Sequence, residues 1–411
     1  MLRQNRRLFA IFLIVFIDLL GFGLILPLLP YYAETFGATD FQVGLLVAVY
    51  AAAQFIATPI LGRLSDRVGR RPVLLISIAG NLVGFIILAL ARSLGMLFMA
   101  RIIAGFTGGN ISVAQAYISD VTDARSRARG LGLIGAAFGL GFIIGPALGG
   151  VLSQWGFAVP ALGAAALSLL NLILVAAWLP ESLTLQARQE AQARPPLTLR
   201  ALVEALRKPL VGPLLHSRFF FAMAFSTFQT IFALYALRRF NLGPRETGYI
   251  LTYVGVLSVL VQGVAVGKLT QRFSERALIL AATALMALSL LGWAWAPSVP
   301  ILLVILAPTA LSGGVLNTVI NSAISKVVAP TDVGGTLGIA SALEALTRIL
   351  SPALGSLLLE QFGPWAPGLA SGVLLLWLTT YVWRYVYRIA VVPAEVAIRP
   401  DPSPQLERLS D

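Results

Sequence analysis

The sequence of 411 residues contains no cysteine and only one histidine, His216. Without cysteine the chain can form neither a disulfide framework nor a thiolate metal site. A single histidine leaves almost nothing for metal binding or Ser/His catalysis, and paired catalytic carboxylates are also missing. We therefore expect no enzyme, no metal site and no cofactor, and we interpret His216 as a capping or interfacial residue near the start of a span.

Charged residues are scarce as well. They make up 12% of the chain, hydrophobic residues make up 58%, and the mean hydropathy is +0.85. This composition argues against a soluble fold. Apolar runs of about twenty residues recur, and each is long enough to cross a hydrocarbon core of roughly 30 Å. Because the runs are continuous rather than alternating, we predict an all-α integral membrane protein with twelve transmembrane helices. The predicted spans are 8–30, 41–62, 72–91, 94–118, 130–152, 157–179, 212–237, 245–267, 276–296, 299–323, 335–358 and 366–388.

The basic residues that give the chain a net charge of +12 are unevenly placed. Most of them lie in the N-terminal segment, in the 62–72 and 120–130 loops, in the central linker and in the other loops on the side of the N-terminus. The opposite loops hold only Arg92, Arg238, Arg239 and Arg245. This asymmetry is the positive-inside rule, so we expect both termini in the cytosol and no nucleic-acid partner. The first apolar run resembles a signal peptide, but it continues past Leu24 without a small-residue cleavage site, and we interpret it as a retained helix. Three lysines against twenty-seven arginines hint at a GC-rich bacterial genome, and hence at a bacterial inner membrane.

An internal repeat divides the chain. Four pairs of segments match at offsets of 205 or 206 residues: GRLSDRVGRR from Gly62 with GKLTQRFSER from Gly267, TGG from Thr107 with SGG from Ser312, ISDV from Ile118 with ISKV from Ile324, and GPALGGVL from Gly145 with SPALGSLL from Ser351. We predict two parallel six-helix repeats, 1–180 and 211–391, joined by a cytosolic linker, 181–210, and followed by a cytosolic tail, 392–411. A substrate site between the halves near the membrane midplane follows from that arrangement.

Several motifs resemble the major facilitator superfamily, and within it the drug:proton antiporter branch that includes tetracycline exporters. The loop signature between the second and third helices is matched by Gly62, Leu64, Asp66, Arg67, Gly69, Arg70 and Arg71. The first helix, FIDLLGFGLILPLLPYY from Phe16, is similar to that of tetracycline-type exporters, and Arg101 with Gly105 resembles the motif of the fourth helix. The fifth helix resembles the antiporter motif at Gly135, Gly139, Gly141, Gly145, Pro146, Gly149 and Gly150. The resemblance covers nearly all of residues 8–390 and implies the major facilitator fold.

Two departures from that family pattern concern acidic residues. Tetracycline exporters typically carry further acids in the third and ninth helices, where this chain has Asn81 and an apolar run after Arg276. The second-half loop has Gln271 in the place of Asp66. The missing acids of the third and ninth helices argue against tetracycline itself as the substrate.

Asp18 is the first candidate for proton coupling. It stands about ten residues into the first helix, roughly 15 Å from the cytosolic end, where a carboxylate costs about 2.5–3.5 kcal/mol on insertion scales. Arg101 enters from the other side to a similar depth, and its long side chain could reach Asp18. We predict that Asp18 exchanges a proton for substrate while Arg101 tunes its acidity. The alternative is a static buried ion pair.

Glu344 and Arg348 form a second charged set inside a span. They are spaced i,i+4 on one helix face, and the repeat aligns them with Phe138 and Phe142 of the first half. This asymmetry predicts a cavity feature in which Glu344 takes part in proton coupling. The alternative is a pair that neutralises itself in lipid.

Three further groups have predicted roles. By resemblance, Gly62, Asp66, Arg67, Gly69 and Arg70, with Asp120, form a conformational latch that braces the outward-open state; the alternative is positive-inside topology alone. A packing hinge between the halves is predicted from the glycines Gly135, Gly139, Gly145 and Gly149 and from a bend at Pro146. The alternative is generic packing of small residues between helices. Candidate cavity residues, which alternatively hold helices together, are Gln54, Asn110, Gln115, Gln229, Asn317, Asn321 and Arg348.

The function that these observations favour is a proton-coupled secondary transporter that exports small lipophilic or cationic drug-like compounds by alternating access. The proton serves as the coupling ion, and the expected partners are the lipid bilayer, a small-molecule substrate and protons. The expected oligomeric state is a monomer. The alternative is an uptake or facilitative transporter of a metabolite such as a sugar, an organic anion or a lipid-like molecule.

Overall fold

The computed structural model describes residues 2–123, 126–183, 204, 206, 208, 210–328 and 333–388. Helices dominate these residues, no strand occurs among them, and twelve helical segments are long and apolar enough to cross a membrane. The prediction of a twelve-span, all-α membrane protein is confirmed. The predicted tail, 392–411, and most of the predicted linker, 181–210, lie outside the described residues.

The spans of the first half begin with a helix that is interrupted near its end by a short 3-10 turn. Its elements are α1 (Leu2–Ile25), η1 (Leu26–Leu28), α2 (Leu29–Glu34), α3 (Asp40–Val68), α4 (Arg70–Ala89), α5 (Leu94–Thr107), α6 (Asn110–Val121), α7 (Arg127–Leu152), η2 (Ser153–Trp155) and α8 (Ala158–Trp178). The spans of the second half include two π-helical turns, η3 and η4. Its elements are α11 (Val211–Phe240), α12 (Pro244–Leu260), η3 (Val261–Ala265), α13 (Val266–Arg272), α14 (Glu275–Ala294), α15 (Val299–Val327), α16 (Val333–Phe362), α17 (Trp365–Val382) and η4 (Trp383–Tyr387).

The turn between the second and third spans depends on a glycine. Gly69 ends α3 and precedes α4 with φ +112° and ψ 158°, a backbone conformation that is essentially restricted to glycine. The equivalent residue of the second half, Ser274, has φ −65°, and its hydroxyl caps α14 by accepting a hydrogen bond from the backbone N–H of Ala277. The two halves therefore make the same connection with different local chemistry.

The fourth span is broken, which differs from the continuous helix predicted over 94–118. The helix α5 ends at Thr107, and α6 begins at Asn110 after two glycines. The Thr107 hydroxyl donates to the carbonyl of Ile103 at 2.9 Å, a back-bond that bends helices, and the glycines Gly108 and Gly109 lower the helix propensity at the same point. The break places Asn110 at the start of a new helix inside the bundle, where it is 6% exposed.

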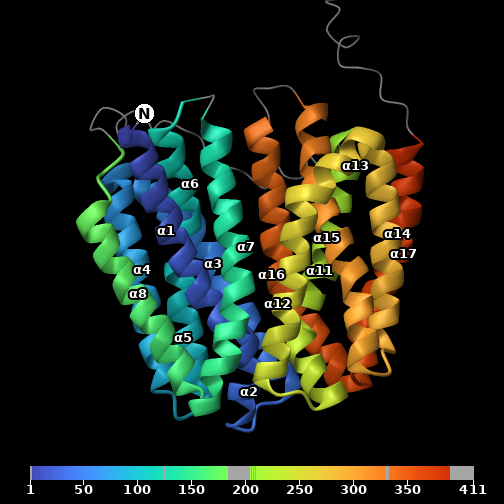
Figure 1. Ribbon diagram of the computed structural model, residues 1–411, viewed down its shortest axis with the longest axis horizontal. Coiled ribbons are helices and arrows are strands. Elements are labelled where there is room, and N and C mark those ends of the chain that lie inside the picture. The colour runs from blue at the N-terminus through green and yellow to red at the C-terminus, as the bar shows by residue number, and fades with distance from the viewer. Residues whose placement is uncertain are drawn as a thin grey trace, which may run out of the picture.

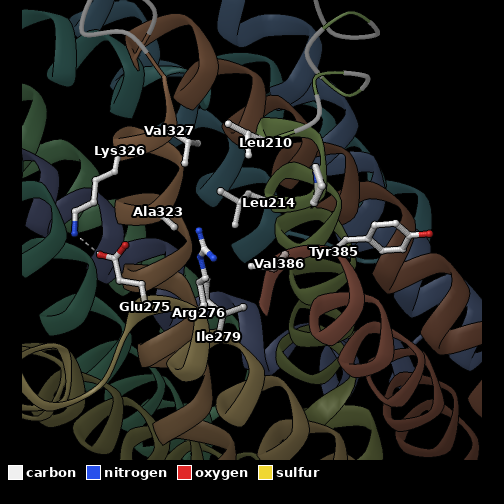
Figure 2. Close-up of a pocket in the computed structure, with 11 residues that line it drawn as sticks. Leu210, Leu214, Glu275, Arg276, Ile279, Ala323, Lys326, Val327, Tyr385 and Val386 are labelled. Carbon is white, nitrogen blue, oxygen red and sulfur yellow. Dashed lines mark hydrogen bonds and ion pairs between the residues drawn. The ribbon is translucent and has the colours of Figure 1, made fainter. Parts of the chain in front are cut away.

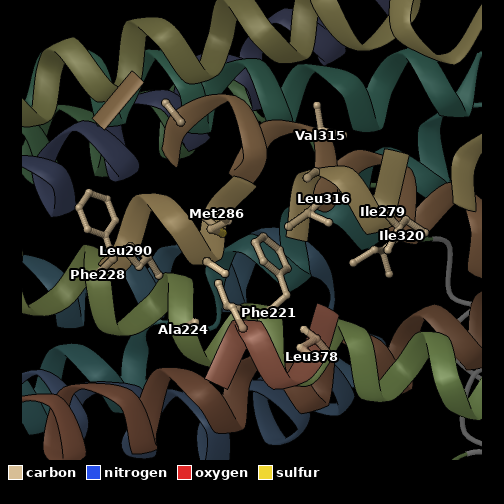
Figure 3. Packing of buried hydrophobic residues seen from close by; sticks show 14 of the residues in the cluster. Phe221, Ala224, Phe228, Ile279, Met286, Leu290, Val315, Leu316, Ile320 and Leu378 are labelled. Atoms are coloured by element: carbon tan, nitrogen blue, oxygen red, sulfur yellow. The ribbon is translucent and has the colours of Figure 1, made fainter. Parts of the chain in front are cut away.

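Packing inside the second half is dense and largely apolar. Figure 3 shows Phe221 and Met286 in the middle of this packing, with Phe228 and Leu290 to one side of them, between helices of this half. Phe228 also meets the ring of Trp293 edge-on, with ring centres 5.4 Å apart. On the outside, by contrast, large side chains such as Val304 are up to 71% exposed, as expected where a bilayer rather than water covers the surface.

The two halves meet at one end of the molecule. In Figure 1 the first-half helices, blue to green, and the second-half helices, yellow-green to red, diverge toward the end that carries the N-terminus and approach each other where α2 lies. We call the first the basic end, because it holds residues 62–71 and 267–276, and the second the Tyr31 end.

Hydrogen bonds and ion pairs between described residues of the two halves lie at the Tyr31 end or near the middle. The Tyr31 hydroxyl is 2.6 Å from Oγ1 of Thr247, and Arg238 forms ion pairs of 2.7 Å with Glu34 and with Asp40. Nearer the middle, the hydroxyl of Thr252 donates to the carbonyl of Ile143 at 2.8 Å. At the basic end, no such contact joins described residues of the two halves.

Glycines let the backbones approach at the Tyr31 end. A Cβ atom at Gly248 of α12 would lie 2.4 Å from the carbonyl oxygen of Pro146 in α7, and one at Gly150 would lie 2.9 Å from Cα of Arg245. A Cβ at Gly44 of α3 would overlap Ser356 of α16. The closed end is therefore sealed by main chain packed against main chain.

Candidate functional site

Asp18 is held by neutral side chains inside the first half. Its half-buried carboxylate accepts a hydrogen bond from Nδ2 of Asn81 in α4 at 3.0 Å, and Asn110 interacts with the same carboxylate. The Asn81 oxygen in turn accepts a hydrogen bond from the hydroxyl of Thr107 at 3.4 Å. Residues on both sides of the break in the fourth span thus contribute to the surroundings of Asp18.

Arg101 does not form the ion pair with Asp18 that the sequence suggested. Its guanidinium carbon lies 4.1 Å from the ring centre of Tyr50 and 5.9 Å from that of Phe22, and the side chain is nearly buried. Two of its nitrogens, Nε and Nη2, are buried without a hydrogen-bond partner. The predicted pairing is wrong for this conformer, because the depth of a residue along a helix leaves open the direction in which its side chain points.

Glu344 lies between two arginines rather than beside one. Its Oε1 accepts a hydrogen bond from Arg348 at 2.8 Å, as the i,i+4 spacing predicted, and its Oε2 accepts one from Arg218 of α11 at 2.5 Å. Arg218 also donates to Oδ1 of Asn317 at 2.7 Å, and it is 5% exposed. The second half therefore contains a cluster with two positive charges and one negative charge, in which Arg218 is buried and Arg348 is exposed.

The sequence analysis missed Arg218, although a signal was present. Arg218 is a lone charged residue seven positions into an apolar span, the same kind of signal that singled out Asp18 and Arg101. Its connection to Glu344 required the packing of α11 against α16, which single-span patterns do not reveal.

The predicted cavity residues have different surroundings. Gln54 donates to the carbonyl of Gly108 at 2.6 Å, so it joins α3 to the break in the fourth span, the alternative expected for polar residues in helices. Asn110 lies near Asp18, and Asn317 belongs to the Glu344 cluster. Arg348 pairs with Glu344. The side chains of the other three residues have no hydrogen bond to a described residue; Gln115 and Gln229 are exposed, and Asn321 is partly buried.

The predicted latch forms a charged network at the basic end. Nη1 of Arg70 lies 2.7 Å from Asp66, Nε lies 3.1 Å from Asp120, and the side chain is nearly buried. Glu181, at the start of the predicted linker, accepts hydrogen bonds from the backbone N–H groups of Arg70 and Arg71 and so caps α4.

Two other residues of the predicted latch stand outside this network. Arg67 is exposed, and a Cβ atom at Gly62 would meet nothing within 4 Å. The network itself joins described residues of the first half only.

The glycines of the fifth span face more than one neighbour, which corrects the expected single thin side. Cβ atoms at Gly145 and Gly149 would meet the backbone of α1 at Gly23 and Leu24, within the first half. A Cβ at Gly139 would instead meet Val259 of the second half, and one at Gly135 would meet nothing within 4 Å. Contacts of this motif with the other half therefore come from Gly139, Gly150 and the carbonyl of Pro146.

A pocket of about 220 Å³ lies at the basic end of the second half, apart from these clusters. Figure 2 shows Leu210, Leu214, Ile279, Val327 and Val386 around it, with the ion pair between Glu275 and Lys326 at one side. None of the predicted cavity residues is among those that line this pocket. Among the described residues, no group of three or more acids and histidines could hold a metal ion.

Comparison with known proteins settles the family. The model of the Major Facilitator Superfamily matches residues 11–266 and 214–408. The chain belongs to the major facilitator superfamily.

The chain is similar to tetracycline resistance proteins and to solute carriers. The class C tetracycline resistance protein of Escherichia coli is 34% identical over 367 residues, which cover 85% of this chain and 89% of that protein. Human solute carrier family 67 member A1 is 30% identical, with 82% of each chain covered. Among solved structures, the human organic anion transporter MFSD10 is 24% identical, with a TM-score of 0.69 over 92% of this chain and 99% of that one.

The fold is shared with a solved structure of lower identity as well. A bacterial homologue of the human lysosomal transporter Spinster is 15% identical, with a TM-score of 0.77 over 96% of this chain and 98% of that one. The expected fold is therefore confirmed, and this member of the major facilitator superfamily is a transporter of small molecules rather than an enzyme.

Proposed function

We propose that this chain is a proton-coupled secondary transporter that exports small lipophilic drug-like compounds by alternating access. The surroundings of Asp18 carry the proposal. A carboxylate that is held by the amides of Asn81 and Asn110 can gain or lose a proton without leaving an oppositely charged partner behind. In the middle of a span, such an acid is a natural site for a coupling proton.

Glu344 fits the coupling role less well than the sequence suggested. Protonation of Glu344 would leave Arg218 and Arg348 without a counter-ion inside the bundle, which is costly for the buried Arg218. We therefore assign Glu344 to a structural ion cluster, the alternative that was open for the pair of Glu344 and Arg348. A cationic substrate would then bind at Asp18, because Asp18, unlike Glu344, forms no ion pair with an arginine.

Relatives support export as the direction of transport. Tetracycline resistance proteins of several classes are similar to this chain over most of its length. The positive-inside rule would place the basic end in the cytosol. Because the two halves are joined at the Tyr31 end, this conformer would then be the one that admits substrate from the cytosol.

The network around Arg70 supplies a brace for the opposite conformer. In the proposed cycle, Asp66, Arg70 and Asp120 form a fixed charged surface on the first half, against which the second half closes at the basic end. The buried position of Arg70 and the capping of α4 by Glu181 hold that surface in place.

A second candidate function is uptake or facilitated movement of a metabolite, which the solute carrier relatives favour. Such a substrate would need several directional hydrogen-bonding groups, but Gln54 and Asn317 are already engaged within the protein. The direction of transport against an imposed pH gradient separates the two candidates.

The test is transport of a panel of lipophilic compounds into proteoliposomes, with and without a pH gradient. The wild type should move a compound uphill at the expense of the gradient. Asp18→Asn should lose uphill transport but retain counterflow exchange, because alternation itself does not need the proton. The matched control is Glu246→Gln, which makes the same acid-to-amide change at an exposed residue in the first turn of α12. Unchanged uphill transport by Asp18→Asn would remove this residue from coupling.

A further inference from the structure

The internal repeat places one ion pair in both halves with its charges exchanged. Arg70 is the ninth residue of GRLSDRVGRR, and Glu275 is the ninth of GKLTQRFSER. Asp120 is the third residue of ISDV, and Lys326 is the third of ISKV. A base and an acid in the first half thus correspond to an acid and a base in the second.

Both pairs are formed, and both make the same connection. Nε of Arg70 lies 3.1 Å from Asp120 and joins α4 to α6, while Nζ of Lys326 lies 2.7 Å from Glu275 and joins α15 to α14. Each acid also accepts a hydrogen bond from a serine hydroxyl, Ser182 for Asp120 and Ser322 for Glu275. Either order of charges would serve this connection within a half.

Helix dipoles account for the order in the second half but not in the first. Glu275 lies in the first turn of α14 and Lys326 in the last turn of α15, where acids and bases respectively are favoured. In the first half, Arg70 begins α4 and Asp120 is next to the last residue of α6, which is the unfavourable order at both helix ends. The order in the first half is therefore not explained by the helix ends alone.

The symmetry of the fold supplies an explanation. Parallel repeats are related by an axis along the membrane normal, so equivalent residues lie at the same depth on opposite sides of that axis. Asp120 and Lys326 keep 23% and 67% of their side chains exposed, so both remain accessible to a partner from across the axis. With the same order in both halves, like charges would oppose each other when the halves approach; with the order reversed, an acid faces a base.

We propose that Asp120 and Lys326 form an ion pair between the two halves in the conformer that is closed at the basic end. The inference rests on the alternating access of the proposed function. In the present conformer, both residues pair within their own halves, and the contacts between described residues of the two halves lie elsewhere. An exposed pair of this kind is expected to change the ratio of the two conformers about two- to fivefold.

The experiment measures the distance across the basic end by spin labelling. Because the chain has no cysteine, labels can be placed at Val68→Cys and Phe273→Cys, two exposed and repeat-equivalent positions. Asp120→Asn and Lys326→Gln should each reduce the short-distance population about two- to fivefold, and the double variant should reduce it no further. Lys268→Gln, an exposed lysine at the same end, is the matched control, and Lys326→Arg should behave as the wild type.

Additive effects of the two neutralising changes, or an unchanged distance distribution in both, would overturn the inference. Thermal unfolding of each variant is the companion measurement. Loss of the ion pair within one half lowers the melting temperature whether or not the two halves pair, whereas loss of the pair between the halves changes the distance distribution. Additive effects together with intact proton-driven export would overturn this pair alone. Non-additive effects in a protein that shows no proton-driven transport would overturn the proposed function and leave the pair standing.

Discussion

Replacing Gly248 by alanine should open the Tyr31 end. The new methyl group would lie 2.4 Å from the carbonyl oxygen of Pro146 and 3.2 Å from its carbonyl carbon, and neither backbone atom can rotate away. Overpacking of this kind costs typically about 1–3 kcal/mol, and here the cost falls only on the conformer in which α12 and α7 are pressed together. At about 1.4 kcal/mol for each factor of ten, the ratio of closed to open Tyr31 end should fall by roughly 5- to 150-fold.

Spin labels provide the assay at both ends. One pair, Leu90→Cys and Trp295→Cys, occupies exposed positions at the Tyr31 end, and the pair at Val68 and Phe273 reports on the basic end. In Gly248→Ala the first distance should lengthen and the second should shorten, because alternating access opens one end as the other closes.

The matched control is Gly267→Ala, where a Cβ atom would meet nothing within 4 Å. It should leave both distances unchanged. Equal distances in Gly248→Ala and the wild type would refute the argument that backbone contact holds the Tyr31 end closed.

Two further changes test individual contacts. Tyr31→Phe removes the hydroxyl that lies 2.6 Å from Oγ1 of Thr247. One hydrogen bond contributes about 1 kcal/mol, so the ratio of closed to open Tyr31 end, measured with the same labels, should fall about fivefold. Labels that report no change would mean that water replaces the hydroxyl at no cost. Gly69→Ala forces a side chain onto φ +112° and should destabilise the protein by about 1–3 kcal/mol, seen as a lower melting temperature, whereas Gly62→Ala, in open space, should not.

The spans and the repeat could be predicted from the sequence because apolar runs and matching segments are recognised without knowledge of tertiary contacts. A run of about twenty apolar residues in lipid forms a helix, because the helix satisfies the hydrogen bonds of its own backbone wherever it lies. The contact between Arg348 and Glu344 was predictable for the same reason, since residues four apart on a helix are neighbours.

Contacts between spans were harder to predict. Arg101 was expected at a depth similar to that of Asp18, but its guanidinium lies against the ring of Tyr50. Depth follows from the rise along a helix, whereas rotation depends on how every neighbouring span packs. Arg218 was overlooked although its residue type was informative, and the break after Thr107 could have been suspected from the two glycines that follow it.

Backbone-to-backbone sealing at the Tyr31 end also bears on leakage. A file of water molecules conducts protons, and it needs a continuous bore lined by polar groups that can hold each molecule. Where the carbonyl of Pro146 faces Gly248 with no space for a methyl group, such a file is interrupted, and side-chain motion cannot reopen it. The contact between Gly248 and Pro146 therefore leaves no path for protons between α12 and α7 at this point of the Tyr31 end.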